Sequence, residues 1–417
     1  MSRYVQNLVA TFASQGATAL SLLLLTPLLV QRLGEGGFST YGILLNLVLI
    51  ASIFDLGLNT GLSHRIIQEP EKRSVLINAV FFYSPLVFLI ALPVFFGLFW
   101  WGWIKVSSSY LFLALLLALL VAQNMMALLF EAILQSVNKI YVSKWIRVGR
   151  TVVEAGLLYV VSGSQRPEWL LLATLLVNVI FIITLFVVTR REVDLSISLA
   201  AFRLKELGGQ LRYSFWYFQS MLAAVIAYNV QIVLLAQYLS VGQMTIFLLV
   251  FKFFEVIRTA MTNFTQVLFP SISMLQAEQR WSQLLRTFRR VLLRVAGFSL
   301  LVFTILWWAG NDFFNWWSGY DTPESNTLFK VYALYVFLLV IDHVSVVFLL
   351  GLKFNRLPSI VSTIQSFLSL VATVYFIQWT GLSGAVLASL LLFATTSLIF
   401  NPLYVLYQLN QRTTAYA

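Results

Sequence analysis

Cysteine is absent from the 417-residue chain, and histidine occurs only twice, as His64 and His343. Without cysteine the chain has no disulfide bonds, no thiolate metal sites and no cysteine nucleophile. The two histidines are far apart in the sequence, so their spacing predicts no zinc site. We therefore expect neither a metal ion nor a cofactor.

Nucleotide-binding and hydrolytic motifs are also missing. The sequence contains no P-loop, no G-x-S-x-G and no paired-acid metal motif. A built-in ATPase is thereby excluded, and any work must come from an ion gradient or from consumption of the product. The longest outer segment, 310–326, carries Asp312, Asp321 and Glu324, but its length suits a surface cap better than a catalytic loop. We expect a protein that is not an enzyme.

Charged residues are scarce, at 10% of the chain, whereas 60% of residues are hydrophobic and the mean hydropathy is +0.86. Soluble domains carry about 25% charged residues. The composition therefore indicates an integral membrane protein. The net charge of +11 then reflects basic cytoplasmic loops, and we expect no nucleic-acid partner.

Long apolar runs recur along the whole chain. About 20 apolar residues cross the hydrocarbon core, and backbone groups in lipid must bond within their own segment, so each run predicts a helix. The first run is too long for a signal peptide, and we expect a retained helix there. Twelve spans are predicted, at residues 6–30, 39–61, 76–102, 109–135, 143–162, 168–189, 213–238, 243–269, 286–309, 327–351, 358–379 and 383–408.

Lysine and arginine alternate with the spans. With both termini in the cytoplasm, nearly all basic loop residues lie on the inner side, and only Arg32, Lys105 and Arg166 lie on the outer side. The six-plus-six division predicts an N-terminal lobe at 1–189 and a C-terminal lobe at 213–417. The connection at 190–212 alternates apolar and basic residues, as a helix lying at the cytoplasmic interface does.

The run "FKFFEVIRTA", residues 251–260, places Lys252, Glu255 and Arg258 inside a predicted span. Each charge would cost about 2.5–3.5 kcal/mol if it faced lipid, so such residues usually face a bundle interior or a wet cavity. At helical spacing the three lie on one polar face, with Phe, Val, Leu and Ile on the other side. Local neutralisation at i,i+3 is the alternative, although one carboxylate cannot cancel two cations.

Other predicted spans carry further polar residues. Arg147, Arg150 and Glu154 share one face, while Glu131, Asp55 and Asp342 lie in three other spans. These polar faces predict a hydrated central cavity, and its cations indicate an anionic ligand such as a phosphate. Pairing of Arg150 with Glu154, snorkelling of Arg147 and Arg150, and a helix-end role for Asp55 remain open alternatives.

The stretch "RLGEGGFSTYGILLNLVLIASIFDLGLNTGL" carries a family resemblance. Its Leu33–Gly34, its Tyr41–Gly42 and its closing Asp55–Leu58 resemble the first inter-helix region of Wzx-type O-antigen flippases. These belong to the polysaccharide transport branch of the multidrug/oligosaccharidyl-lipid/polysaccharide (MOP) exporters. Of the candidate site residues, the resemblance carries over only Asp55.

The resemblance implies an all-helical inner-membrane protein of bacteria, with two six-helix lobes in a V. Such a protein flips an undecaprenyl-pyrophosphate-linked oligosaccharide from the cytoplasmic to the periplasmic leaflet by alternating access, with coupling to protons in several members. The partners it implies are the lipid-linked substrate, the bilayer, protons or other coupling ions, and a polymerase on the periplasmic side.

Our site prediction combines this function with the polar faces. Lys252 and Arg258 are expected to hold the anionic head group, with Arg147 and Arg150 controlling access from the cytoplasm. The expected proton-coupling candidates are Glu255, Asp55, Glu131, Glu154 and Asp342.

Two other functions stay open. A multidrug or cation antiporter of the same superfamily would favour a cavity with net negative charge. A membrane polysaccharide polymerase or ligase would need catalytic groups in an outer loop, for which Asp312, Asp321 and Glu324 are the candidates.

Overall fold

Helices make up almost all of the chain that the structure describes. The computed structural model describes residues 3–104, 108–193, 195, 197–266, 268–354 and 356–415. Lys105, placed on the outer side by the sequence, lies outside the described residues. The described residues form two compact units, within Met1–Gln237 and Tyr238–Ala417.

The first unit contains eight α-helices and their short connecting helices among its described residues. Its α-helices are α1 (Arg3–Ile50), α2 (Leu58–Gln68), α3 (Arg73–Trp100), α4 (Tyr110–Ser136), α5 (Ile140–Val161), α6 (Pro167–Glu192), α7 (Leu204–Val225) and α8 (Gln231–Leu235). The connections are η1 (Ala51–Asp55), η2 (Pro70–Lys72), η3 (Ser162–Ser164), η4 (Leu199–Ala201) and the π-helical turn η5 (Ile226–Val230).

The second unit follows the same pattern of long apolar helices. Its α-helices are α9 (Val241–Gln266), α10 (Phe269–Ala277), α11 (Trp281–Ile305), α12 (Asn311–Ser318), α13 (Pro323–Gly351), α14 (Arg356–Thr380), α15 (Gly384–Thr395) and α16 (Ser397–Ala415). The π-helical turn η6 (Leu306–Gly310) joins α11 to α12, and η7 (Gly381–Ser383) joins α14 to α15.

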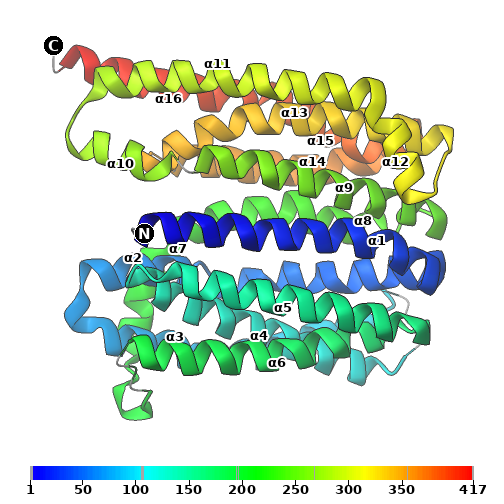
Figure 1. Ribbon diagram of the computed structural model, residues 1–417, viewed down its shortest axis with the longest axis horizontal. Coiled ribbons are helices and arrows are strands. Elements are labelled where there is room, and N and C mark those ends of the chain that lie inside the picture. The colour runs from blue at the N-terminus through cyan, green and yellow to red at the C-terminus, as the bar shows by residue number, and fades with distance from the viewer. Residues whose placement is uncertain are drawn as a thin grey trace. The chain divides into compact units, whose positions relative to one another are not determined.

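The chain reverses direction inside α1, at Gly34. This residue has φ 69° and ψ 172°, a conformation that glycine adopts readily and most other residues avoid. The two halves of α1 run in opposite directions on either side of it (Figure 1). The apolar segment Val5–Gln68, 64 residues long, therefore contains two lengths of helix that can each cross a membrane.

Seven segments among the described residues are long and apolar enough to span a membrane, or up to eight if the bent pair α7 and α8 counts as one. The difference from the twelve predicted spans has a physical origin. Two of the segments, Val5–Gln68 and Arg356–Thr414, are 64 and 59 residues long and so have twice the length of one span. Helices α5 and α9 are not among the seven because each carries three or more charged side chains.

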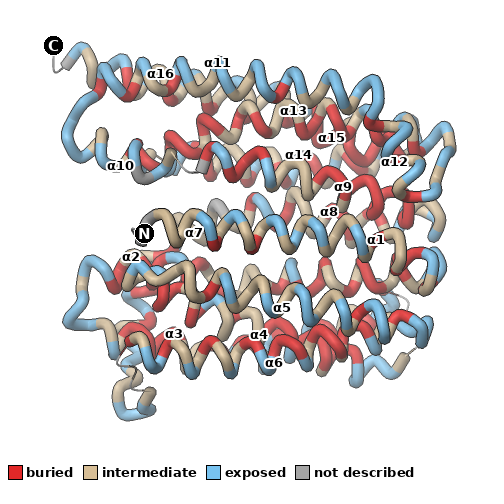
Figure 2. The backbone as a smooth tube through the Cα atoms, in the orientation of Figure 1, coloured by how far each residue is buried: buried red, intermediate tan, exposed pale blue. Residues whose placement is uncertain are grey.

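Apolar side chains cover much of the outer surface. Only 6% of the most apolar stretch of Trp281–Ser318 is buried, and Figure 2 shows α11 mostly exposed or half-buried, whereas α13 contains many more buried residues. Phe298, Leu300 and Leu301 are each more than half exposed. Exposed apolar surface of this extent belongs in lipid, and the protein is a multi-pass integral membrane protein.

The predicted connection at 190–212 contains parts of several helices. Residues 190–212 comprise the end of α6, the short turn η4 and the first two turns of α7. Contacts of α7 with α2 and α3 place it in the first compact unit, which ends at Gln237. The basic stretch 281–294 forms the first part of α11.

Candidate functional site: charged residues within apolar helices

The first charged cluster joins α4 to α5. The carboxylate of Glu131 accepts a hydrogen bond from Arg147, and its other oxygen lies 3.8 Å from Lys144 Nζ. Exposure of the side chains is 12% for Glu131 and 33% for Arg147. One carboxylate shared by two cations leaves this cluster with an excess of positive charge.

Arg150 lies one turn further along α5. Its Nη2 is 3.1 Å from Glu154 Oε2, and its guanidinium stacks over the ring of Phe181 in α6, 5.4 Å from the centroid. The predicted local pairing of Arg150 with Glu154 is therefore present. In the described part of the chain, the Nε atoms of Arg147 and Arg150 are buried without a hydrogen-bond partner. A buried donor left in this way costs about 1–3 kcal/mol, so an added acceptor such as a phosphate oxygen would stabilise the cluster.

Asp55 marks a break between α1 and α2. It is buried and accepts a hydrogen bond from the Asn59 side chain. The next two residues, Leu56 and Gly57, have φ 49° and 70°, so the motif Asp55–Leu58 interrupts the helix here. The structure gives Asp55 no ion-pair partner among the residues it describes.

Gly57 and Gly61 bring α2 into close contact with α7. A Cβ at Gly57 would lie 2.7 Å from Phe218 N and 2.9 Å from Ser214 O, and one at Gly61 would lie 2.2 Å from Ser214 Oγ. Gln210 Nε2 donates to the Leu58 carbonyl at 3.2 Å in the same interface. Sequence reasoning missed this contact, although the G-x-x-x-G spacing of Gly57 and Gly61 signals close helix packing.

Beyond these glycines, Arg65 links the end of α2 to α7. It binds Glu69 at 2.9 Å and Glu206 of α7 at 3.2 Å. Glu69 also binds Lys72 at 2.7 Å. Hydrogen bonds from Arg65 and Lys72 lower the pKa of Glu69 to about 2.

The second unit carries its own charged face, on α9. Lys252 Nζ lies 2.8 Å from Glu255 Oε2, which is the local pairing that the i,i+3 spacing allows. Arg258 lies one turn further along and interacts electrostatically with His343 of α13. His343 Nε2 is buried without a hydrogen-bond partner in the described part of the chain. Helical spacing also puts Gln266 on this polar face, and its side chain lies outside the described residues.

Asp342 joins α13 to α16. Both of its carboxylate oxygens lie 3.1 Å from Asn401 Nδ2, and 5% of Asp342 is exposed. No cation forms an ion pair with Asp342 among the described residues. Asp55 in the first unit and Asp342 in the second are thus both buried carboxylates bonded to an asparagine amide.

The predicted site residues therefore form pairs within each unit. Glu131, Arg147, Arg150 and Glu154 lie together in the first unit, and Lys252, Glu255 and Arg258 lie along α9 in the second. No group of three or more histidine, aspartate or glutamate side chains that could hold a metal ion occurs in the described ranges.

A comparison with protein families identifies the family to which this chain belongs. The model of the polysaccharide biosynthesis protein family matches residues 4–276, well over half of the chain. The chain belongs to this family. Comparison with curated proteins finds no match.

The fold of this family member is that of MOP-superfamily transporters. An inward-facing multidrug resistance MATE family transporter of the MOP superfamily matches 99% of this chain and 100% of its own, with a TM-score of 0.73 and 14% identity. Lipid II flippase MurJ in an inward closed conformation matches 97% of this chain and 87% of its own, with a TM-score of 0.68 and 14% identity. A MOP superfamily transporter from Pyrococcus furiosus, with a binding pocket of reverse polarity, matches 99% of this chain and 96% of its own, with a TM-score of 0.64 and 14% identity.

Proposed function

We propose that this protein flips a lipid-linked oligosaccharide from the cytoplasmic to the periplasmic leaflet of a bacterial inner membrane. Its substrate is an undecaprenyl-pyrophosphate-linked repeat unit of the O-antigen type, which a polymerase on the periplasmic side then uses. The observation that carries the proposal is the set of cations on α5 and α9, in a member of the polysaccharide biosynthesis family.

In this proposal the chain crosses the membrane twelve times, with both termini in the cytoplasm. The helices α3, α4, α6, α11 and α13 cross once each, and the two halves of α1 and the two halves of Arg356–Thr414 add four crossings. The helices α5, α7 with α8, and α9 supply the remaining three. Two six-helix lobes then alternate access. Lys252 and Arg258 hold the diphosphate, and Arg147 and Arg150 bind it first as it enters from the cytoplasm.

Buried carboxylates couple transport to the movement of protons in this proposal. Asp55 and Asp342 each accept hydrogen bonds from an asparagine amide and form no ion pair in the described part of the chain. A buried carboxylate without a cation takes up a proton more readily than one in an ion pair. We place the proton carriers at these two residues. Glu131, Glu154 and Glu255 have cationic partners and serve to set the charge of the site.

Transport in vesicles tests the proposal. Purified protein in liposomes is given a fluorescent prenyl-diphosphate-linked disaccharide, and a membrane-impermeant quencher reports its movement between leaflets. The wild type should move this probe, and the double variant Lys252→Ala/Arg258→Ala should slow it at least tenfold. The matched control, Arg289→Ala/Arg290→Ala, removes two exposed cations of α11 and should leave the rate unchanged.

Two outcomes would overturn this function. The first is wild-type protein that leaves the probe in its original leaflet. The second is full transport by the Lys252→Ala/Arg258→Ala variant at normal protein level. Uptake of a cationic dye such as ethidium in place of the probe would support the antiporter instead.

A further inference from the structure

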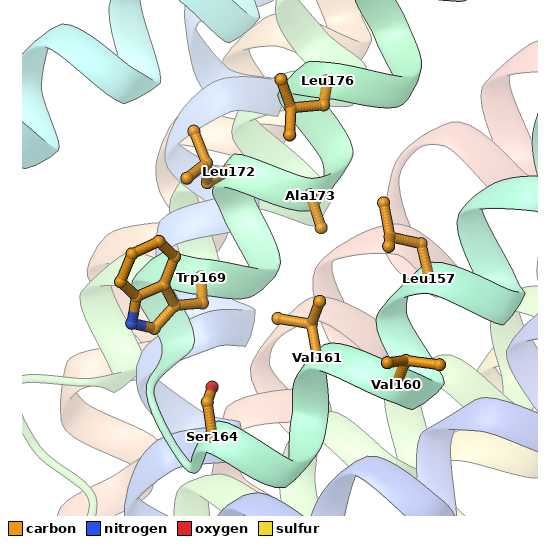
Figure 3. A pocket seen from close by; sticks show the side chains of 8 residues that line it. All are labelled: Leu157, Val160, Val161, Ser164, Trp169, Leu172, Ala173 and Leu176. Carbon is orange, nitrogen blue, oxygen red and sulfur yellow. The ribbon is translucent and has the colours of Figure 1, made fainter.

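An apolar groove opens between α5 and α6 near the connection of these two helices. It has a volume of about 400 Å³. Leu157, Val160 and Val161 of α5 face Leu172, Ala173 and Leu176 of α6 across it (Figure 3). Trp169 lies at one end of the groove and is about half exposed, as a tryptophan at the edge of a bilayer is.

The groove lies in line with the arginines of α5. At 100° per residue, Leu157 and Val161 fall within about 20° of Arg150 around the helix axis. They lie about 10 and 16 Å further along it. One face of α5 therefore offers cations first and an apolar groove next, and this order matches a molecule with an anionic head and a hydrocarbon chain.

The depth of Arg150 in the membrane distinguishes a resident bilayer phospholipid from a lipid that is crossing between the leaflets. Arg150 is at the midpoint of the 22-residue α5, and the proposed topology, in which α5 spans the membrane, therefore places it near the middle of the membrane. A bilayer phospholipid keeps its phosphate about 15 Å from the bilayer centre, because the hydrocarbon core is about 30 Å thick. A lipid in transit between leaflets must instead bring its head group to mid-depth.

We infer that the α5–α6 groove holds the polyprenyl chain of the lipid-linked substrate while its diphosphate lies at Arg150 and Arg147. This inference rests on the proposed function and adds to it a binding site for the polyprenyl chain of the substrate. The buried Nε atoms of the two arginines, which have no partner in the described part of the chain, supply donors for the diphosphate oxygens. The groove supplies apolar contact to the chain and so keeps it beside the protein while the head group crosses.

Photo-crosslinking tests the groove directly. Purified protein in nanodiscs is labelled with a photoreactive prenyl diphosphate and with the matching uncharged prenol, and the labelled peptides are identified. We expect the label on residues 157–176. Ala173→Trp fills the groove and should lower labelling by both probes at least fivefold, and Ala173→Leu should give a smaller loss in the same direction. Arg150→Gln should lower labelling by the diphosphate alone.

The matched control is Ile180→Trp, which adds the same side chain at an exposed position of α6 outside the groove and should leave labelling unchanged. Excess unlabelled prenyl diphosphate should displace the probe, whereas an equal amount of phosphatidylglycerol should not. Equal displacement by phosphatidylglycerol would show that the groove holds ordinary lipid and would overturn the inference. Label outside 157–176, or full labelling of Ala173→Trp, would overturn it as well.

The vesicle assay keeps the two proposals apart. If the wild type and Ala173→Trp move the fluorescent probe equally fast, the groove assignment fails and the flippase function stands. If the wild type moves no probe, the function itself fails, whatever the crosslinking shows.

Discussion

Replacing Gly57 by alanine should disrupt the packing of α2 against α7. The added Cβ would lie 2.7 Å from Phe218 N and 2.9 Å from Ser214 O, both of them backbone atoms of α7. Ordinary contacts of a carbon atom begin near 3.5 Å, so α7 would have to move by more than half an ångström. The substitution also places a Cβ on a residue with φ 70°.

The expected cost follows from these two effects. A left-handed backbone costs a residue other than glycine roughly 1–2 kcal/mol. Overpacking of a tight contact costs about 1–3 kcal/mol. Their sum, about 2–5 kcal/mol, corresponds to a change of roughly 30-fold or more in the equilibrium for holding α7 against α2.

Thermal denaturation in detergent measures this cost. Gly57→Ala should melt several degrees below the wild type. Gly149→Ala, in α5, is the matched control because a Cβ there has no neighbour within 4 Å. Alanine is favoured over glycine in a helix by about 0.5–1 kcal/mol, so this control should be neutral or slightly stabilising.

A second substitution sharpens the test. At Gly61 the added Cβ meets the side chain of Ser214, at 2.2 Å from Oγ, and not its backbone. Ser214→Gly should therefore recover part of the stability lost in Gly61→Ala and none of that lost in Gly57→Ala. If Gly57→Ala were as stable as the wild type, or if Ser214→Gly rescued both variants equally, the described contact between α2 and α7 would be wrong.

Two further predictions concern the same interface. Gly61→Cys/Ser214→Cys should form a disulfide under mild oxidation, because the two Cβ atoms would lie 3.2 Å apart and need to separate by only a few tenths of an ångström to reach disulfide geometry. The chain has no other cysteine, so the single-cysteine variants are the controls. Failure of the pair to cross-link on a non-reducing gel would contradict the contact. The ion pairs of Glu69 with Arg65 and Lys72 lower its pKa to about 2, so their contribution to stability should be present above about pH 4.5 and disappear as the pH falls toward 2. The melting temperatures of the wild type and Glu69→Gln should accordingly converge over that range, and a constant difference would speak against the pairing.

Hydropathy and local spacing predicted a large part of this molecule. Apolar runs of about 20 residues gave the membrane class, because lipid requires helices that satisfy their own backbone. Ion pairs at three and four residues, such as Lys252 with Glu255 and Arg150 with Glu154, follow from helix geometry alone. The predicted spans 6–30 and 39–61 likewise leave a gap between them, and the turn around Gly34 lies in that gap.

Contacts between distant parts of the chain could not be predicted in this way. Asp342 meets Asn401 across 59 residues, and Arg65 meets Glu206 across 141, and each pair depends on how whole helices pack. The start of α7 at Leu204 likewise could not be predicted, because an alternation of apolar and basic residues can belong either to an interfacial helix or to the end of a span. The predicted arrangement of the lobes and the roles of the charged residues stay predictions.

The ion pairs of α5 have a consequence for affinity. In the proposed mechanism an arriving phosphate finds one terminal nitrogen of Arg147 and one of Arg150 already bound to Glu131 and Glu154, so at those atoms it competes with carboxylates that the same helices hold in place. Binding by exchange of one anion for another gives a shallower energy minimum than binding to bare cations would. The returning carboxylates then help to expel the phosphate, which favours rapid turnover over tight retention of the cargo.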